Sequence, residues 1–135
     1  MNLDDLIAVS GFPGLYRMAA NRGNGLIVEH LETGKRRFAS ARRHQFTPLA
    51  SIAIFTDDGD STELKNVFRN MRDQYNDRPP VDPNASPEEL FDYFADVLPN
   101  YDTDRVHQGD VKKVIKWFNF LYSNGLLSDS DEEEE

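Results

Sequence analysis

The chain has 135 residues, a formal net charge of −9 and no cysteine, and 39% of its residues are apolar. This length fits one average domain or two very small ones, and the apolar content is sufficient for a folded core. A chain without cysteine has no disulfide and no thiolate chemistry, and no apolar run approaches the roughly 20 residues that span a membrane. We expect a cytoplasmic protein without a membrane partner, and the acidic N-terminus argues against a secretory signal.

The sequence changes character near Thr56. Up to that residue it carries 7 basic and 4 acidic side chains, and beyond it 8 basic and 20 acidic ones. Apolar residues alternate with polar ones in the first part and recur at helical spacing in the second. We therefore predict a small β-domain over residues 1–57 and a helical domain over residues 60–127. An acidic tail follows at 128–135, and like-charge repulsion is expected to keep it extended and disordered.

Short strands separated by glycine-containing turns are predicted in the first part. Asn21–Gly25 and Glu32–Gly34 are typical of tight hairpin turns, because glycine and asparagine tolerate a left-handed backbone. A flat open sheet of this size would expose its edges and one apolar face. A closed sheet avoids both costs, so we predict an α+β protein with a small SH3-like β-barrel followed by a three-helix domain. The predicted strands cover residues 15–20, 26–31, 35–41 and 51–56, with a further strand or helical turn at 4–9.

Three helices are predicted in the second part. The first is expected to start at a capping box in Asp60–Glu63, and the second at the N-cap Ser86. Asp110 is expected to cap the third helix, which Gly125 closes while Leu126 folds back as in a Schellman motif. The predicted helices cover about residues 61–75, 87–98 and 111–124.

No group of residues in the sequence indicates catalysis or metal binding. His30, His44 and His107 do not have the short spacing of a metal site. The acidic run Asp57–Asp60 departs from the calcium-loop pattern and is expected to be a strand-to-helix turn. We therefore expect no catalytic residue, no metal site and no cofactor.

An arginine group in the β-domain is the first candidate binding surface. It consists of Arg36, Arg37, Arg42 and Arg43, with Phe38 and Phe46 interleaved. Arginines beside aromatic side chains on a small β-domain are typical of surfaces that bind single-stranded nucleic acid. Two other interpretations are open, in which the cations solvate an edge strand or face the acidic helical half.

The third helix supplies the second candidate surface, because its apolar face is unusually wide. Trp117 and Phe120 broaden the stripe beyond what two other short helices can cover. The surplus apolar surface is expected to dock on the β-domain or on another chain.

Nine short segments spread over nearly the whole chain carry a family resemblance. They are Ser10–Tyr16, Gly25–Glu29, Gly34–Arg36, Ser51–Thr56, Tyr93–Pro99, Tyr101–Asp102, Arg105–Val106, Asp110–Trp117 and Gly125–Leu127. These segments resemble an uncharacterised family of short bacterial proteins found chiefly in the Bacteroidetes. The resemblance implies a small N-terminal domain of unknown function followed by a helical domain. It implies no activity, cofactor or catalytic residue.

The favoured function is a non-catalytic binding or adaptor protein rather than an enzyme. Its partner is expected to be another protein or a second copy of the chain. The alternative is RNA or single-stranded DNA binding through the arginine-rich face of the β-domain, which the overall acidity makes less favoured.

Overall fold

The computed structural model describes residues 3–127, and the acidic tail predicted at 128–135 lies outside them. The chain divides between Ile52 and Ala53 into two compact units, called here the sheet unit and the helical unit. The boundary predicted near residue 57 lies several residues further along the chain. The last predicted strand therefore falls mostly in the helical unit.

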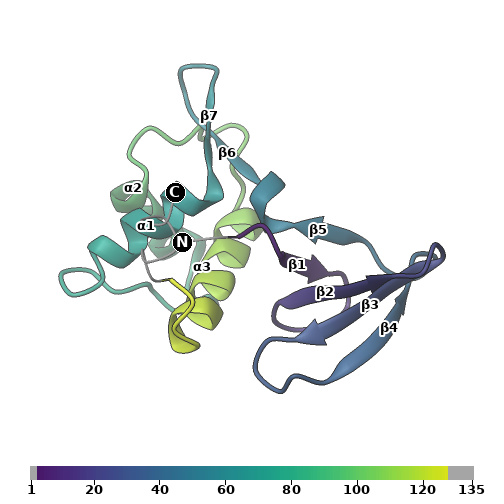
Figure 1. Ribbon diagram of the computed structural model, residues 1–135. Coiled ribbons are helices and arrows are strands. Elements are labelled where there is room, and N and C mark those ends of the chain that lie inside the picture. The colour runs from purple at the N-terminus through teal and green to yellow at the C-terminus, as the bar shows by residue number, and fades with distance from the viewer. Residues whose placement is uncertain (1–2, 128–135) are drawn as a thin grey trace, which may run out of the picture. The chain divides into compact units, whose positions relative to one another are not determined.

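The sheet unit is a five-stranded antiparallel sheet in the order β4-β3-β2-β1-β5 (Figure 1). Gly23 and Gly34 have positive φ values in the turns before β3 and β4, which confirms the two predicted hairpin turns. The strands are β1 (Leu6–Val9), β2 (Tyr16–Asn21), β3 (Gly25–His30), β4 (Arg36–Ser40) and β5 (Phe46–Pro48), and the short 3-10 helix η1 (Leu49–Ser51) follows β5.

The predicted SH3-like barrel is wrong, because the sheet is open. β4 and β5 form its two edges and do not pair with each other in the described residues. The apolar face that closure was expected to cover is covered locally instead, since Phe12 from the turn after β1 and Phe46 from β5 pack onto it. β5 has only three residues and ends in a proline, so it offers little backbone for closing a barrel. The buried cluster consists of Ile7, Val9, Tyr16, Val28 and Ala39.

The helical unit starts with a two-stranded hairpin and continues with three helices, which confirms the predicted helix number (Figure 1). Ser86 caps α2 as predicted, because its Oγ accepts a hydrogen bond from the N–H of Glu89 at 3.2 Å. The predicted Schellman motif is also present, since Leu126 N donates to Leu121 O at 2.9 Å and Gly125 has a φ of 68°. The elements are β6 (Ala53–Phe55), β7 (Ser61–Glu63), α1 (Leu64–Asp73), α2 (Pro87–Val97) and α3 (Gln108–Ser123).

The capping box predicted at Asp60–Glu63 is wrong, because most of that segment is the strand β7. α1 starts only at Leu64, and the side chain of its N-cap residue Glu63 makes no capping hydrogen bond. The third helix, α3, starts before Asp110, whose carboxylate accepts the N–H of His107 at 3.0 Å. Asp110 therefore caps α3 from inside its first turn rather than from in front of it.

The acidic run Asp57–Asp60 forms the turn between β6 and β7 instead of the predicted strand-to-helix turn. Asp58 organises it, since its Oδ1 accepts hydrogen bonds from Thr56 Oγ1 at 2.6 Å and from Asp60 N at 3.1 Å. The bond from Thr56 and the bond from Asp60 lower the pKa of Asp58. The acidic side chains in this run thus build a turn, as aspartates commonly do.

Each helix buries one apolar face in the helical unit. Asn70 of α1 also links two helices through a hydrogen bond from its Nδ2 to the carbonyl of Val97, at 3.2 Å. Among residues 3–127, no helix is long and apolar enough to cross a membrane. The fully or nearly fully buried helical residues are Leu64, Val67, Phe68, Met71, Leu90, Tyr93, Phe94, Val97, Val111, Val114, Ile115, Phe118 and Leu121.

Candidate functional site

β4 is an edge strand, so one side of its backbone has no neighbouring strand among the described residues. Its pairing with β3 is regular from one end to the other. Two hydrogen bonds, one at each end of the β3–β4 ladder, show which residue pairs are hydrogen-bonded: His30 N donates to Lys35 O at 2.9 Å, and Ala41 N donates to Asn24 O at 3.0 Å. Because hydrogen-bonded and non-hydrogen-bonded pairs alternate in an antiparallel ladder, the direction of each β4 backbone group follows.

The N–H and C=O groups of Arg36 and Phe38 point away from β3. These residues stand opposite Glu29 and Ile27 and occupy the non-hydrogen-bonded positions of the ladder. Arg37, which lies between them, directs its backbone groups toward β3. The outer edge of β4 therefore presents free backbone donors and acceptors at alternate residues.

Arg36 and Arg37 lie on opposite faces of the sheet, because successive side chains of a strand alternate. Arg36 Nε forms an ion pair with Glu29 Oε1 at 3.0 Å, and 66% of the Arg36 side chain is exposed. The Arg37 guanidinium instead lies over the ring of Phe12, with Cζ 3.9 Å from the ring centroid. The predicted arginine-rich face is therefore divided between the two sides of β4.

Arg42 and Arg43 lie in the exposed turn that follows β4. Their backbone N–H groups bind Ser40, with Arg42 N donating to Ser40 Oγ and Arg43 N to Ser40 O, both at 3.2 Å. Neither guanidinium has a partner among the described residues. This turn adds two uncompensated cations at one end of the outer edge of β4.

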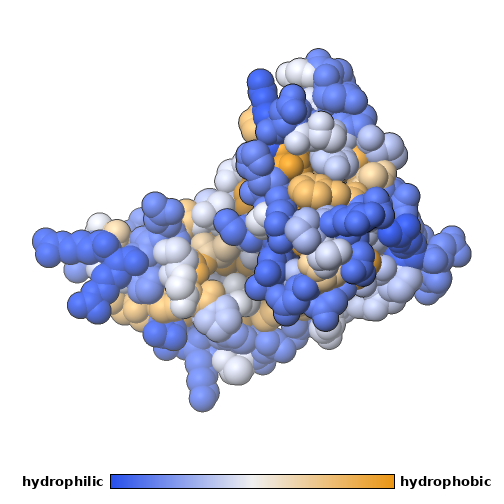
Figure 2. Space-filling model, turned by 180° about the vertical axis from the view of Figure 1, so that it is seen from behind, coloured by the Kyte–Doolittle hydropathy of each residue, from blue (hydrophilic) through white to orange (hydrophobic). Residues whose placement is uncertain are grey.

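Phe38 is the exposed aromatic residue of β4, with 45% of its surface accessible. Its ring covers Gly25 on the neighbouring strand, since a Cβ built on Gly25 would lie 2.8 Å from Phe38 Cζ and 2.3 Å from Ala39 O. An aromatic ring over a strand glycine restores the apolar cover that the missing side chain does not provide. Figure 2 shows one face of the molecule, where hydrophobic surface appears in several separate areas among hydrophilic side chains.

Trp117 and Phe120 lie on α3, and both are partly buried. Phe118 and Leu121, which directly follow Trp117 and Phe120 in the helix, are fully buried. The carbonyl of Phe120 accepts a hydrogen bond from Asn124 Nδ2 at 2.7 Å. A docking role for Trp117 and Phe120 stays a prediction.

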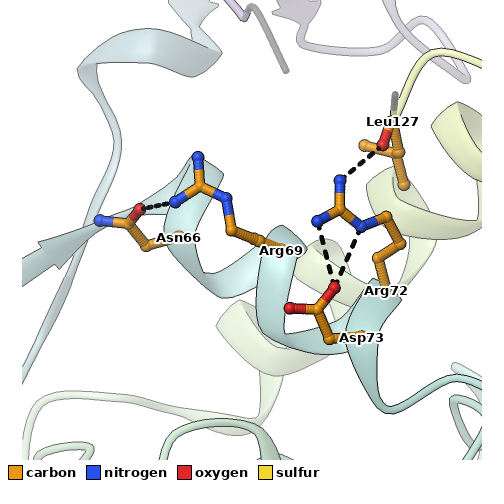
Figure 3. A network of polar contacts seen from close by, with 5 residues as sticks. All are labelled: Asn66, Arg69, Arg72, Asp73 and Leu127. Atoms are coloured by element: carbon orange, nitrogen blue, oxygen red, sulfur yellow. Dashed lines mark hydrogen bonds and ion pairs between the residues drawn. The ribbon is translucent and has the colours of Figure 1, made fainter. Parts of the chain in front are cut away.

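A polar network stands at the end of α1 and at the exit of the chain from α3 (Figure 3). Arg72 Nη1 donates to the carbonyl of Leu127 at 3.0 Å, and its Nε and Nη2 donate to Asp73 Oδ1 at 3.3 and 3.1 Å. One turn earlier, Arg69 Nη1 donates to Asn66 Oδ1 at 3.0 Å. Arg72 thus ties the segment after α3 to α1, which is a structural contact within the helical unit.

Tyr93 of α2 is fully buried, and its hydroxyl lies near Gln74 and Arg78. Neither Tyr93 Oη nor Gln74 Nε2 has a hydrogen-bond partner of good geometry among the described residues. Burial raises the pKa of Tyr93 to about 12, although Gln74 and Arg78 act in the opposite direction. Arg78 also forms an ion pair with Asp96 and lies with Cζ 5.8 Å from the Tyr93 ring centroid.

The three histidines take part in local contacts of the backbone. His30 Nδ1 accepts the N–H of Glu32 at 3.1 Å, and His44 Nδ1 lies 2.7 Å from Ser10 O. The backbone N–H of His107 binds Asp110, as described for α3. Within residues 3–127, no group of three histidine, aspartate or glutamate residues is arranged to hold a metal ion.

The sequence left an edge strand open as one interpretation of the arginine group, but the favoured prediction was a closed barrel, in which β4 has no open edge. The signal that identifies it is the composition of the two candidate edges. The strand with Pro48 is short and lacks a backbone donor at its end, whereas the strand with Arg36 is longer and carries two arginines.

The comparisons with known proteins agree with this two-unit architecture. A solved structure, the solution NMR structure of a structural-genomics target from Bacteroides vulgatus, is similar to the chain with 40% identity and a TM-score of 0.76. The match covers 93% of this chain and 89% of the other. A search of curated proteins found no match.

Two family models cover most of the chain. Residues 3–49 match the family model "Domain of unknown function (DUF5606)", and residues 52–121 match "Domain of unknown function (DUF6852)". The resemblance to an uncharacterised two-domain family is thereby confirmed, and the chain belongs to the family that these two domains of unknown function describe.

Proposed function

We propose that the protein is a non-catalytic binding or adaptor protein, and that the outer edge of β4 receives a protein partner. The observation that carries this proposal is the open edge itself. Arg36 and Phe38 have backbone groups that point away from the sheet, and 45% of the surface of Phe38 is exposed at the same edge. An exposed sheet edge is a ready template for pairing with another chain.

The difference between the two edges of the sheet supports the choice of β4. β5 has two of the features that proteins use to prevent edge pairing, because it is short and ends in Pro48. β4 has five residues, no proline and an uninterrupted register with β3. Among the residues of the sheet unit, the cations of β4 are the feature that discourages edge pairing, and cations leave the edge available to a partner of opposite charge.

The histidines support a structural rather than a catalytic interpretation. His30 and His44 each use Nδ1 in a turn of the sheet unit, and His107 stands at the start of α3. These local contacts account for each histidine without a reaction. The cytoplasmic location expected from the composition stays a prediction.

Site-specific photo-crosslinking in the cell that naturally makes the protein tests the proposal. A photoreactive phenylalanine analogue replaces Phe38, and the same analogue at the exposed Tyr122 of the helical unit serves as the matched control. We expect a defined protein adduct from position 38 that position 122 does not give. Identical adducts from both positions, no protein adduct, or an adduct that nuclease removes would each contradict a protein partner on β4.

A further inference from the structure

We infer that the partner segment is an extended acidic peptide that pairs with β4 as a sixth strand of the sheet. This inference rests on the proposed function and specifies the chemistry of its partner. Three features of the sheet unit lead to it: the backbone of the edge, the distribution of its cations, and the exposed aromatic side chain.

The backbone groups along the outer edge of β4 favour a peptide over a nucleic acid as the partner. Along the outer edge of β4, each of Arg36 and Phe38 offers one N–H and one C=O. An extended peptide presents the same alternation of donors and acceptors at the same two-residue repeat. A nucleic-acid strand has no such repeat of amide donors and acceptors, so it can use the cations but not the backbone edge.

The arginines of β4 and of the turn after it favour acidic side chains in the partner peptide. Arg36 and Arg37 project from opposite faces of β4, and an added strand also places its side chains alternately on both faces. Each face of the added strand therefore runs past one arginine: Arg36 on one face and, on the other, Arg37, whose guanidinium also lies over the ring of Phe12. Glu29 binds Arg36 through Nε, which leaves the Nη donors of that side chain for a second carboxylate. Arg42 and Arg43 extend the positive charge past one end of the strand.

Phe38 defines the apolar position of the segment. It lies on the same face as Arg36, two residues further along β4. Cross-strand pairs that include an aromatic and an apolar or β-branched side chain stabilise a sheet. The preferred segment thus has acids opposite Arg36 and Arg37 and an apolar residue opposite Phe38, as three consecutive residues in either strand direction.

Binding of synthetic probes to the full-length protein tests this inference. The first probe is a short, labelled peptide with two acids next to a leucine in a β-branched background. Its twins carry lysines in place of the acids, or N-methyl groups on alternate backbone nitrogens. Single-stranded oligothymidylate is the nucleic-acid probe. Fluorescence anisotropy gives the affinities, and amide exchange by NMR gives the site.

We expect the acidic peptide to bind and the lysine twin not to bind. Each lost backbone hydrogen bond weakens binding by about 3- to 10-fold, so the N-methylated twin is expected to bind at least that much more weakly. Amide exchange at Arg36 and Phe38 is expected to slow on binding, while that of Arg37 changes little because its N–H already faces β3. Equal affinity for the N-methylated twin, or tighter binding of oligothymidylate, would overturn the strand-addition model.

A pair of protein variants gives an independent check. Arg36→Pro removes one outward N–H without removing a β3–β4 hydrogen bond, and Arg36→Ala removes the same charge but keeps the N–H. We expect Arg36→Pro to bind the acidic peptide more weakly than Arg36→Ala does. Equal affinities of the two folded variants would overturn the inference. A crosslink at position 38 together with no acidic-peptide binding would refute this inference alone, whereas no crosslink would refute the proposed function.

Discussion

The guanidinium of Arg37 lies over the ring of Phe12, with Cζ 3.9 Å from the ring centroid. This contact joins the edge strand β4 to the turn that follows β1. The Phe12 ring also contacts Tyr16 and His44, with centroid separations of 5.8 and 4.4 Å. Arg37 therefore helps to hold the turn on the apolar face of the sheet, which distinguishes it from Arg36 on the opposite face.

Replacing Arg37 by alanine is expected to lower the free energy of unfolding by about 0.5–2 kcal/mol, because a cation–π contact is lost. Arg36→Ala removes an exposed ion pair and is expected to cost about 0–1 kcal/mol. Urea denaturation of both variants, with a double-mutant cycle between Arg37 and Phe12, measures the difference. A coupling energy of zero between Arg37 and Phe12 would contradict the assigned contact.

Gly25→Ala is expected to destabilise the sheet unit by about 1–3 kcal/mol, because the added Cβ overpacks the strand. It would lie 2.3 Å from Ala39 O and 2.8 Å from Phe38 Cζ. The carbonyl oxygen belongs to the backbone and cannot rotate away. Gly109→Ala in the first turn of α3 is the matched control, since its Cβ meets open space.

For this control we expect a stabilisation of up to about 1 kcal/mol, because alanine is the better helix former. Thermal and urea unfolding of the two variants would show opposite signs. If Gly25→Ala were as well tolerated as Gly109→Ala, the close approach of β3 and β4 at Gly25 would be wrong.

Tyr93 predicts a loss of stability at alkaline pH. Burial raises its pKa from 10.0 to about 12, so the folded state favours the neutral phenol. The raised pKa stabilises the protein below the unfolded value of 10.0, and this contribution is lost as pH rises through about 12. A two-unit shift corresponds to about 2–3 kcal/mol. We expect the free energy of unfolding to fall across this range.

Tyr93→Phe is the matched variant, because it removes the ionisation and the unpaired hydroxyl together. The difference in unfolding free energy between wild type and variant is expected to change between pH 10 and 12, while the contributions of lysines cancel. Ultraviolet titration of tyrosinate absorbance gives the pKa directly. A constant difference over this pH range would contradict the raised pKa of Tyr93.

Ser86→Ala is expected to destabilise the protein by about 1 kcal/mol through loss of the α2 N-cap. Ser86 Oγ accepts the N–H of Glu89 at 3.2 Å and donates to Glu89 Oε1 at 3.1 Å. Ser61→Ala on the exposed surface of β7 is the control, with an expected effect within about 0.5 kcal/mol. Equal melting temperatures for Ser86→Ala and wild type would argue against the cap.

The helix boundaries at Ser86 and Gly125 were predicted correctly because the interactions that set them are local. An N-cap bond spans three residues, and a Schellman bond joins Leu126 to Leu121. The error at Asp60–Glu63 has the opposite cause. That segment has a capping pattern, but pairing of β7 with β6 makes it extended, and strand pairing depends on residues elsewhere in the chain.

The two-part organisation was predictable from the sequence, as were the hairpin turns at Gly23 and Gly34 and the three apolar helix faces, because periodicity and turn chemistry act over a few residues. The open sheet, in contrast, depends on the folded structure, where Phe12 and Phe46 pack on the apolar face without closure. The same openness separates Arg36 from Arg37 across two faces and leaves the outer backbone of β4 available. A sequence pattern does not contain that information, because which strands become edges is set by the pairing of the whole sheet.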